Sequence, residues 1–321
     1  MKILLTGITG NLGYEIADDL IARGSKVVPI VRPGKGDIFS AEGLKFEEVV
    51  ESDLVNGPEI DFSGKADCII HCAGIVHFKN AGNANEKMVL KVIGLAERLQ
   101  IPLYFISTAF VYRPPEAAKN FNNSYEEDKW RAEEALIASG IPHTIFRPSI
   151  LVGNSQTGRI QNFNGYYLVV RALLSAVNNL RTGQQKLRFP RLTGKTNMVT
   201  IDQAAQSINN KVRDGQLGHF FVTNPNPPIF AWVLEQTLEL TGIRDNIDLI
   251  DCSFEEFSKL DLTETERKLY QFTTHFNPYW SIAYNFPDSI CAENLIDRQY
   301  LAKTLDYFRN SQDSSNEQAN Y

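Results

Sequence analysis

The stretch that decides the fold is Met1-Lys2-Ile3-Leu4-Leu5-Thr6-Gly7-Ile8-Thr9-Gly10-Asn11-Leu12-Gly13. Its pattern predicts a buried strand over Lys2–Thr6 and a helix over Asn11–Arg23. Glycines between them allow a tight turn and a close backbone approach to a ligand, and the free N–H groups at the start of a helix favour an anion. The G-x-x-G-x-x-G spacing is one residue longer than the G-x-G-x-x-G dinucleotide fingerprint. The turn therefore predicts a pyrophosphate site at Gly7, Thr9, Gly10, Asn11, Leu12 and Gly13.

Strand and helix patterns alternate along the first half of the chain. Apolar runs predict further strands over Lys26–Val31, Phe46–Val50, Asp67–His71, Leu103–Ser107 and His143–Phe146. Helical patterns predict helices over Asn85–Leu99 and Tyr125–Ser139. Near-continuous apolar strands separated by helices are typical of a parallel sheet covered on both faces. The sequence therefore predicts an α/β fold, a Rossmann-type doubly wound parallel sheet, over residues 1–150.

The pattern changes after about Pro148, where the alternation becomes irregular and Gly, Asn and Pro are common. Helices are still predicted over Tyr166–Asn178, Asp202–Val212, Ile229–Thr241 and Leu295–Phe308. We therefore expect a smaller C-terminal α/β substrate domain over residues 151–309, with later segments returning to the first domain. The polar composition of residues 310–321 predicts a disordered tail.

Composition narrows the classes of protein. The 321 residues carry a net charge of −6, which argues against nucleic acid as the main partner. No apolar run reaches the roughly 20 residues of a membrane helix, and the N-terminal apolar stretch is too short for a signal peptide. We therefore expect no membrane partner and a cytoplasmic location. The four cysteines lack C-x-x-C spacing, so neither a metal site nor a disulfide framework is predicted.

The residues after the second strand favour NADP(H) as the cofactor. An acid at this place hydrogen-bonds the ribose 2′-OH of NAD, whereas an Arg accommodates the 2′-phosphate of NADP. The segment Val28-Pro29-Ile30-Val31-Arg32-Pro33-Gly34-Lys35 has two bases and no acid. The sequence therefore predicts NADP(H), with Arg32 on the phosphate.

Tyr125 and Lys129 stand four residues apart at the start of a predicted helix, so they share a face. A free phenol has a pKa near 10, and a neighbouring ammonium lowers it. The pair therefore predicts a general acid for a carbonyl oxygen that receives a hydride.

These motifs together resemble an extended short-chain dehydrogenase/reductase, from the glycine turn to about residue 245. The resemblance implies an adenine-contacting acid at Asp53, with Leu54 beside it, and a structural Asn at Asn85, although the family's usual Gly-Thr is replaced by Met88-Val89. It implies a catalytic Thr at Thr108 and the catalytic roles of Tyr125 and Lys129. Further cofactor contacts are implied at Cys72, Ala73, Gly74, Ser107, Pro148, Ser149 and Ile150.

One branch of that family fits best. The segments Arg147–Gly158, Ile75–Phe78 and Phe221–Pro227 are similar to the thioester-reductase (male-sterility-like) group. The resemblance implies NADPH-dependent reduction of an acyl thioester to an aldehyde or alcohol. The substrate would arrive in trans on CoA or on an acyl or peptidyl carrier protein. A homodimer through helices resembling Asn85–Leu99 and Tyr125–Ser139 is implied by analogy.

Two features bear on the substrate. From Pro148 to Ile201 there is no Asp or Glu, but there are seven bases: Arg159, Arg171, Arg181, Lys186, Arg188, Arg191 and Lys195. This segment either meets an anionic partner or forms a basic solvated face. Aromatic residues then either line an acyl pocket or pack between domains: Tyr270, Phe272, Phe276, Tyr279, Trp280, Tyr284 and Phe286.

Two alternatives remain open on the sequence. The first is a reductase or epimerase acting on a sugar nucleotide or small ketone, which would use the same Thr108, Tyr125 and Lys129. A 4,6-dehydratase is disfavoured, because Ala109-Phe110 replace the Asp-Glu pair that the resemblance would require. The second is a cofactor-binding sensor or scaffold without chemistry, which would not need to keep that set.

Overall fold

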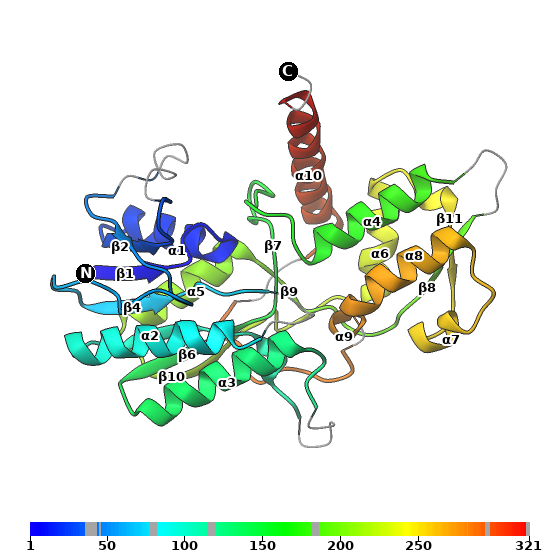
Figure 1. Ribbon diagram of the computed structural model, residues 1–321. Coiled ribbons are helices and arrows are strands. Elements are labelled where there is room, and N and C mark those ends of the chain that lie inside the picture. Colours follow the sequence, from blue (N-terminus) through cyan, green and yellow to red (C-terminus); the bar gives the residue numbers. More distant parts are fainter. Residues whose placement is uncertain are drawn as a thin grey trace. The chain divides into compact units, whose positions relative to one another are not determined.

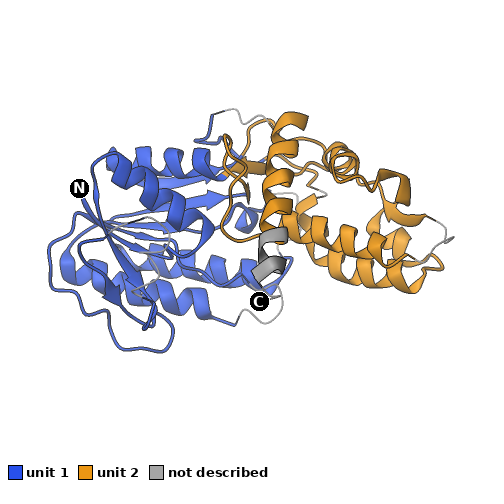
Figure 2. Ribbon diagram, turned by 90° about the horizontal axis from the view of Figure 1, so that it is seen from above, with its two compact units in different colours: residues 1–149, 201–223, 286–292 blue, residues 150–200, 224–285, 293–321 orange. Residues whose placement is uncertain are grey.

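The computed structural model describes residues 1–35, 44, 46–76, 82–114, 120–180, 186–280, 282–292 and 296–318. The chain forms two compact units (Figure 2). The first unit comprises residues 1–149, 201–223 and 286–292, and the second comprises residues 150–200, 224–285 and 293–321. The chain thus leaves the first unit at Ser149 and returns to it twice.

A parallel sheet forms the centre of the first unit (Figure 1). Its strand order is β10-β6-β5-β4-β1-β2-β3, and all neighbours are parallel. The order reverses between β1 and β4, where doubly wound sheets bind ligands at the carboxyl ends of their strands. The predicted fold class is therefore confirmed. The strands are β1 (Lys2–Thr6), β2 (Lys26–Val31), β3 (Val50–Glu51), β4 (Cys68–His71), β5 (Leu103–Ile106), β6 (His143–Pro148) and β10 (Gly218–Val222).

Helices cover both faces of this sheet (Figure 1). Helices α1 (Asn11–Ala22) and α5 (Ile201–Arg213) pack against each other on one face, and α2 (Ala84–Leu99) and α3 (Ser124–Ser139) do so on the other. Successive side chains of a strand point to opposite faces, so every second residue of the central strands joins the core that includes α2 and α3. That core includes Leu4, Ile69, Leu103, Phe105 and Ile145, together with Val89, Val92 and Leu136 of the helices.

The edge strand β10 is covered by residues 286–292, which return from far along the chain. Ser289 Oγ donates to the Thr223 carbonyl at 2.6 Å and accepts from the Thr223 N–H at 3.1 Å. The Ile290 N–H donates to the Phe221 carbonyl at 2.9 Å. An open strand edge invites pairing with another chain, so this segment protects the end of the sheet.

The second unit combines helices with two short parallel strand pairs. Strand β7 (Ile150–Val152) pairs with β9 (Met198–Thr200), and β8 (Leu187–Pro190) pairs with β11 (Ile247–Ile250). One of its cores gathers side chains of α4, α6 and α10, among them Tyr167, Val233 and Leu301. The helices are α4 (Tyr166–Asn178), α6 (Phe230–Leu240), α7 (Phe254–Ser258), α8 (Glu264–Thr273), α9 (Asn277–Trp280) and α10 (Arg298–Gln318), with 3₁₀ turns η3 (Arg244–Asn246) and η4 (Thr274–Phe276).

One local expectation was wrong. The strand predicted over Phe46–Val50 is only β3 (Val50–Glu51), and the Glu47 and Glu48 side chains before it pair with Lys26 and Lys2. In the tail predicted over residues 310–321, the structure extends α10 as far as Gln318. Helix α10 is anchored by buried residues upstream, and no Gly or Pro interrupts it. Extending a formed helix costs much less free energy than nucleating one.

In the ranges described above, no helix has the length and apolar character needed to cross a membrane.

Two leucines of α2 allow a matched test of the core under that helix. Leu95 is fully buried, whereas Leu90 is 50% exposed. We expect Leu95→Ala to lower the free energy of unfolding by about 2–5 kcal/mol, because it leaves a cavity. Leu90→Ala should change it by less than about 0.5 kcal/mol. Urea denaturation of both variants measures the difference, and equal losses would contradict this placement of α2.

Candidate active site

The glycine turn after β1 lies against the turn after β4. Gly7 has a φ of +77°, and a Cβ at this residue would lie 2.4 Å from the Ala73 nitrogen. A Cβ on Gly13 would lie 2.2 Å from the Gly7 carbonyl oxygen. Only glycine fits at either place, so the two turns meet through bare backbone. Gly10 caps α1, whose first turn contains no acid, so nothing there repels an anion.

Side-chain hydrogen bonds fix the turn after β4. Thr6 Oγ1 lies 2.7 Å from His71 Nδ1 and accepts from the Ala73 N–H at 3.1 Å. Burial, and secondly the Lys129 charge, lower the pKa of His71 to about 3, so the ring is neutral. The structure therefore brings Gly7, Cys72 and Ala73 together, as a shared cofactor-facing surface requires.

Thr108 and Tyr125 meet although they lie on different elements. Thr108 follows β5 and caps the 3₁₀ turn η2 (Ala109–Val111), and Tyr125 is in the first turn of α3. Their side chains are hydrogen-bonded to each other. Burial is the largest influence on Tyr125 and raises the pKa of its phenol, with the Glu126 charge acting in the same direction. The phenol is therefore protonated at neutral pH.

This direction corrects one expectation, since the sequence predicts that Lys129 lowers the pKa of Tyr125. Lys129 Nζ instead donates to the Ile106 carbonyl at 2.9 Å and lies 4.8 Å from the centroid of the Phe105 ring. Burial lowers the pKa of Lys129 to about 8, so its ammonium form is only partly retained above that pH. Burial is thus the largest influence on the pKa of both groups.

The buried Glu126 carboxylate forms an ion pair with the partly buried Arg113, which the sequence did not reveal. Arg113 donates to Glu126 Oε2 at 2.5 Å and to the Phe110 and Tyr112 carbonyls at 2.5 and 2.9 Å. The pair joins the segment after Thr108 to the first turn of α3, and so holds Thr108 and Tyr125 in place. Arg and Glu separated by a loop carry no periodic signal, so no sequence pattern could have identified this pair.

Two buried polar atoms at the carboxyl ends of β4 and β5 have no hydrogen-bond partner among the described residues. They are His71 Nε2 and Ser107 Oγ. Buried polar groups are nearly always paired, so an unpaired hydroxyl beside Thr108 is consistent with a ligand contact at Ser107. Together with the glycine cradle, these groups fit a dinucleotide at this end of the sheet.

Two charged residues lie at the end of β2: Arg32, which the sequence predicts as a cofactor contact, and Glu51, which it does not. Arg32 follows β2 directly and is exposed. Glu51 of β3 is paired in register with Val31, and its carboxylate accepts from the Gly34 N–H at 3.2 Å. The sequence segment around Arg32 contains no acid. Glu51 was missed because it reaches this position through sheet pairing and not through its place in the chain.

The structure also places the other predicted cofactor residues. Asp53 Oδ1 accepts from the backbone of Val55 and Asn56, which lowers the pKa of its carboxyl group, and Leu54 is buried in the core. Thr9 is exposed in the turn, Asn11 is half-buried at the start of α1, and Leu12 is buried. Pro148 ends β6, and the Ser149 N–H donates to the Val222 carbonyl. Ile150 belongs to the second unit.

Several of the basic and aromatic residues that were considered for substrate binding have partners within the second unit. Arg188 pairs with Glu266 at 2.8 Å and Arg191 with Asp251 at 3.5 Å, so the acid-free segment is partly neutralised by later acids. Trp280 stacks on Phe230 at 4.6 Å. Phe286 instead packs in the first unit, on Phe110, Tyr112 and Phe221. The predicted positions His77, Phe78 and Arg181 lie outside the described residues.

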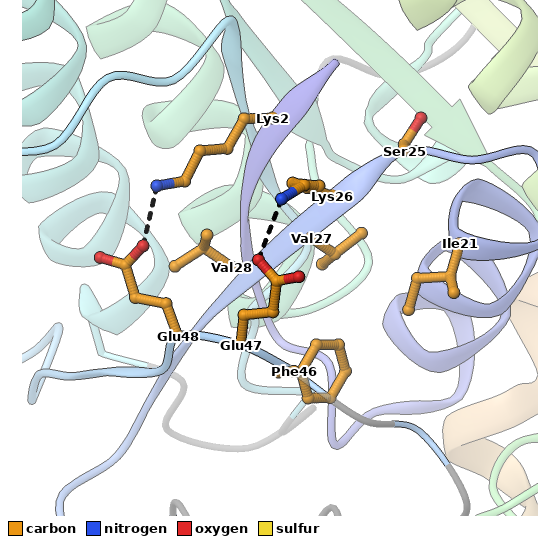
Figure 3. Close-up of a pocket in the computed structure, with 9 residues that line it drawn as sticks. All are labelled: Lys2, Ile21, Ser25, Lys26, Val27, Val28, Phe46, Glu47 and Glu48. Carbon is orange, nitrogen blue, oxygen red and sulfur yellow. Dashed lines mark hydrogen bonds and ion pairs between the residues drawn. The ribbon is translucent and has the colours of Figure 1, made fainter.

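A hollow of about 310 Å³, open to solvent, lies at the amino ends of β1 and β2 (Figure 3). Lys2 and Lys26 line it together with their partners Glu48 and Glu47. The glycine turn follows the carboxyl end of β1, so this hollow is separate from the candidate active site.

The glycine cradle can be tested by stability. We expect Gly13→Ala to destabilise the protein by about 1–3 kcal/mol, because its methyl group would clash with the Gly7 carbonyl. Gly94→Ala, in α2, meets no atom within 4 Å and should stabilise by about 0.4–1 kcal/mol. Thermal unfolding measures both. Stabilisation by both variants would mean that α1 does not approach the turn this closely.

Known proteins resemble this chain in sequence and in fold. Residues 59–208 match the family model described as male sterility protein. The hybrid PKS-NRPS synthetase pvhA of Talaromyces variabilis is 26% identical over 230 residues, which is 64% of this chain and 5% of that protein. The chain thus spans about one twentieth of the length of that relative.

Solved structures share the fold. The terminal R domain of the myxalamid PKS-NRPS pathway has a TM-score of 0.71 at 20% identity, over 97% of this chain and 91% of that chain. A thiolation-reductase di-domain from an archaeal non-ribosomal peptide synthetase gives 0.66 at 18%, over 97% and 75%. The Bordetella bronchiseptica enzyme WbmG in complex with NAD gives 0.60 at 15%, over 97% and 94%. The chain thus resembles the male sterility family over residues 59–208, and it shares its Rossmann-type fold with reductase domains of PKS-NRPS and non-ribosomal peptide systems and with WbmG.

Proposed function

We propose that this protein uses NADPH to reduce an acyl thioester, carried by CoA or by an acyl or peptidyl carrier protein, to an aldehyde or alcohol. The observation that carries the proposal is the convergence of Tyr125, Thr108 and Lys129 beside the glycine cradle. The named relatives support the thioester, since they are a PKS-NRPS synthetase and reductase domains of such systems.

The cradle residues Gly7, Gly10 and Gly13 would hold the pyrophosphate of the cofactor, and Arg32 its 2′-phosphate. Lys129 would hold the ribose. When bound, NADPH supplies a hydride to the thioester carbonyl carbon. Preference for NADPH over NADH rests on Arg32, because an always-charged guanidinium suits a phosphate.

Tyr125 and Thr108 would hydrogen-bond the carbonyl oxygen as it becomes negative, the usual source of large electrostatic stabilisation. The Tyr125 phenol is protonated at neutral pH, so it can pass its proton to that oxygen. The resulting hemithioacetal then loses its C–S bond. One hydride and one proton enter, and one aldehyde and one thiol leave. A second reduction of the aldehyde would give the alcohol.

A carbonyl or sugar-nucleotide substrate is the second candidate. It is favoured by the fold shared with UDP-glucose 4-epimerase of Bifidobacterium longum, at a TM-score of 0.60 and 13% identity. The two candidates use the same Tyr125 chemistry, so substrate panels distinguish them. NADPH oxidation coupled to thiol release establishes the thioester, whereas turnover of UDP-sugars or ketones alone would overturn it. NADPH binding without any turnover would indicate a sensor.

Removal of the Tyr125 hydroxyl tests its role as acid. We expect Tyr125→Phe to lower kcat by about 10²- to 10⁴-fold, with little change in the Kd for NADPH. Tyr104→Phe, in the buried part of β5, is the control and should keep its activity. Stopped-flow NADPH oxidation measures kcat, and full activity of Tyr125→Phe would exclude the acid role.

Cofactor choice is tested at the two ends of β2. Arg32→Ala should weaken NADPH binding by roughly 10- to 100-fold and leave NADH binding nearly unchanged, since it removes one charge-assisted contact. Lys26→Ala, at the amino end of the same strand, should affect neither. Fluorescence titration with both nucleotides gives the ratio, and equal losses for both would contradict the 2′-phosphate contact.

A further inference from the structure

The residue immediately before Lys129 is a buried carboxylate that links two helices. Asp128 lies on α3, and its side chain is fully buried. Oδ2 accepts from the Asn85 backbone N–H at 2.9 Å and from Asn85 Nδ2 at 2.8 Å. Oδ1 accepts from the Glu86 N–H at 3.2 Å. All three donors belong to the first turn of α2.

Asp128 thus caps a helix to which it does not belong. The N-cap residue of α2, Asn83, makes no side-chain capping hydrogen bond. The first N–H groups of a helix need acceptors, and an anion at this end also interacts favourably with the helix dipole. A buried carboxylate without partners would be strongly destabilising, so α2 and Asp128 satisfy each other.

Asn85 carries this link to the turn after β4. Its Oδ1 accepts from the Ile75 N–H at 2.9 Å, and its Nδ2 donates to the Ile75 carbonyl at 3.1 Å. A Cβ on Gly74 would lie 3.1 Å from Lys129 Nζ and 3.2 Å from Asn85 Oδ1. The turn therefore lies directly against both the ammonium and the Asn85 amide.

We propose that Asp128 is a positioning residue, which holds Lys129 as a cation and fixes the Gly74–Ile75 turn through Asn85. The assignment rests on the proposed reductase function, in which Lys129 and this turn bind the cofactor. The Asp128 carboxylate would then have two effects: it would stabilise the charge of Lys129, and it would fix the backbone of the turn that faces Lys129.

The charges around Lys129 support the electrostatic half of the proposal. Burial is the largest influence and lowers the pKa of Lys129 to about 8, whereas the Asp128 and Glu133 charges raise it. His71 on β4 is neutral. Strand β5 contributes the Ile106 carbonyl and the Phe105 ring, and α2 contributes the uncharged Asn85. Loss of the Asp128 charge should therefore make Lys129 lose its proton at a lower pH.

The test is Asp128→Asn, a substitution of nearly equal volume, with Glu127→Gln as the matched control on the exposed side of α3. The Kd for NADPH is measured by fluorescence from pH 6 to 9.5, and amide hydrogen exchange is followed on the protein alone. We expect the alkaline loss of NADPH affinity to move down by about one pH unit in Asp128→Asn, a roughly tenfold difference at a fixed alkaline pH. The amides of Ile75, Asn85 and Glu86 should exchange faster. Glu127→Gln should change neither.

Two other outcomes decide against the proposal. Faster exchange without a pH shift would make Asp128 a helix cap only, and unchanged exchange and pH dependence would exclude both roles. If the wild-type protein binds NADPH but reduces no thioester, the proposed function fails while the cofactor titration still decides the role of Asp128.

If Asp128→Asn does not fold, Asn85→Ala provides a second test. It keeps the Asp128 charge beside Lys129 but removes both side-chain contacts to Ile75. We expect the Ile75 amide to exchange faster, while the alkaline loss of NADPH affinity stays at the same pH as in the wild-type protein. If NADPH affinity were lost at a lower pH in this variant as well, the effect could not be assigned to the Asp128 charge.

Discussion

The candidate site depends on the burial of charge along one helix. Four ionisable side chains of α3 are almost completely inaccessible: Glu126, Asp128, Lys129 and Glu133. Moving a charge out of water costs several kcal/mol unless partners replace the lost hydration. Each of these groups has such partners, and each partner belongs to a different part of the first unit. The helix is therefore positioned by polar contacts as much as by apolar packing.

Those partners determine what lies around the reacting groups. Arg113 ties Glu126 to the segment after Thr108, and Asp128 ties α3 to α2. Arg147 pairs with Glu133 at 2.5 Å and so ties α3 to β6. Lys129 reaches the end of β5 through the Ile106 carbonyl. Tyr125 and Lys129 thus stand on a helix that is anchored to four neighbours, which gives them a defined geometry. Such anchoring is how a scaffold preorganises a site.

The sequence predicted the parts of this arrangement that follow from local rules. The strand, glycine turn and helix of residues 2–22 follow from periodicity and from the special role of glycine, and the shared face of Tyr125 and Lys129 follows from helical spacing. The partners of Glu126 and Asp128 could not be predicted, because they depend on which segments fold side by side. For the same reason Glu51 was not recognised beside Arg32. The pKa direction of Tyr125 was missed because spacing carries no information about burial.

The segment that covers β10 has a consequence for how the protein is made. Thr223 and Ser289 are 66 residues apart in the sequence, yet they complete the same edge. During synthesis at about 5–20 residues per second, the last strand of the sheet leaves the ribosome several seconds before its cover does. For that interval the nascent chain presents a finished sheet with one open side, and much of the second unit must be translated before that side is closed. Speed of translation and protection by chaperones therefore matter most for this protein between those two points.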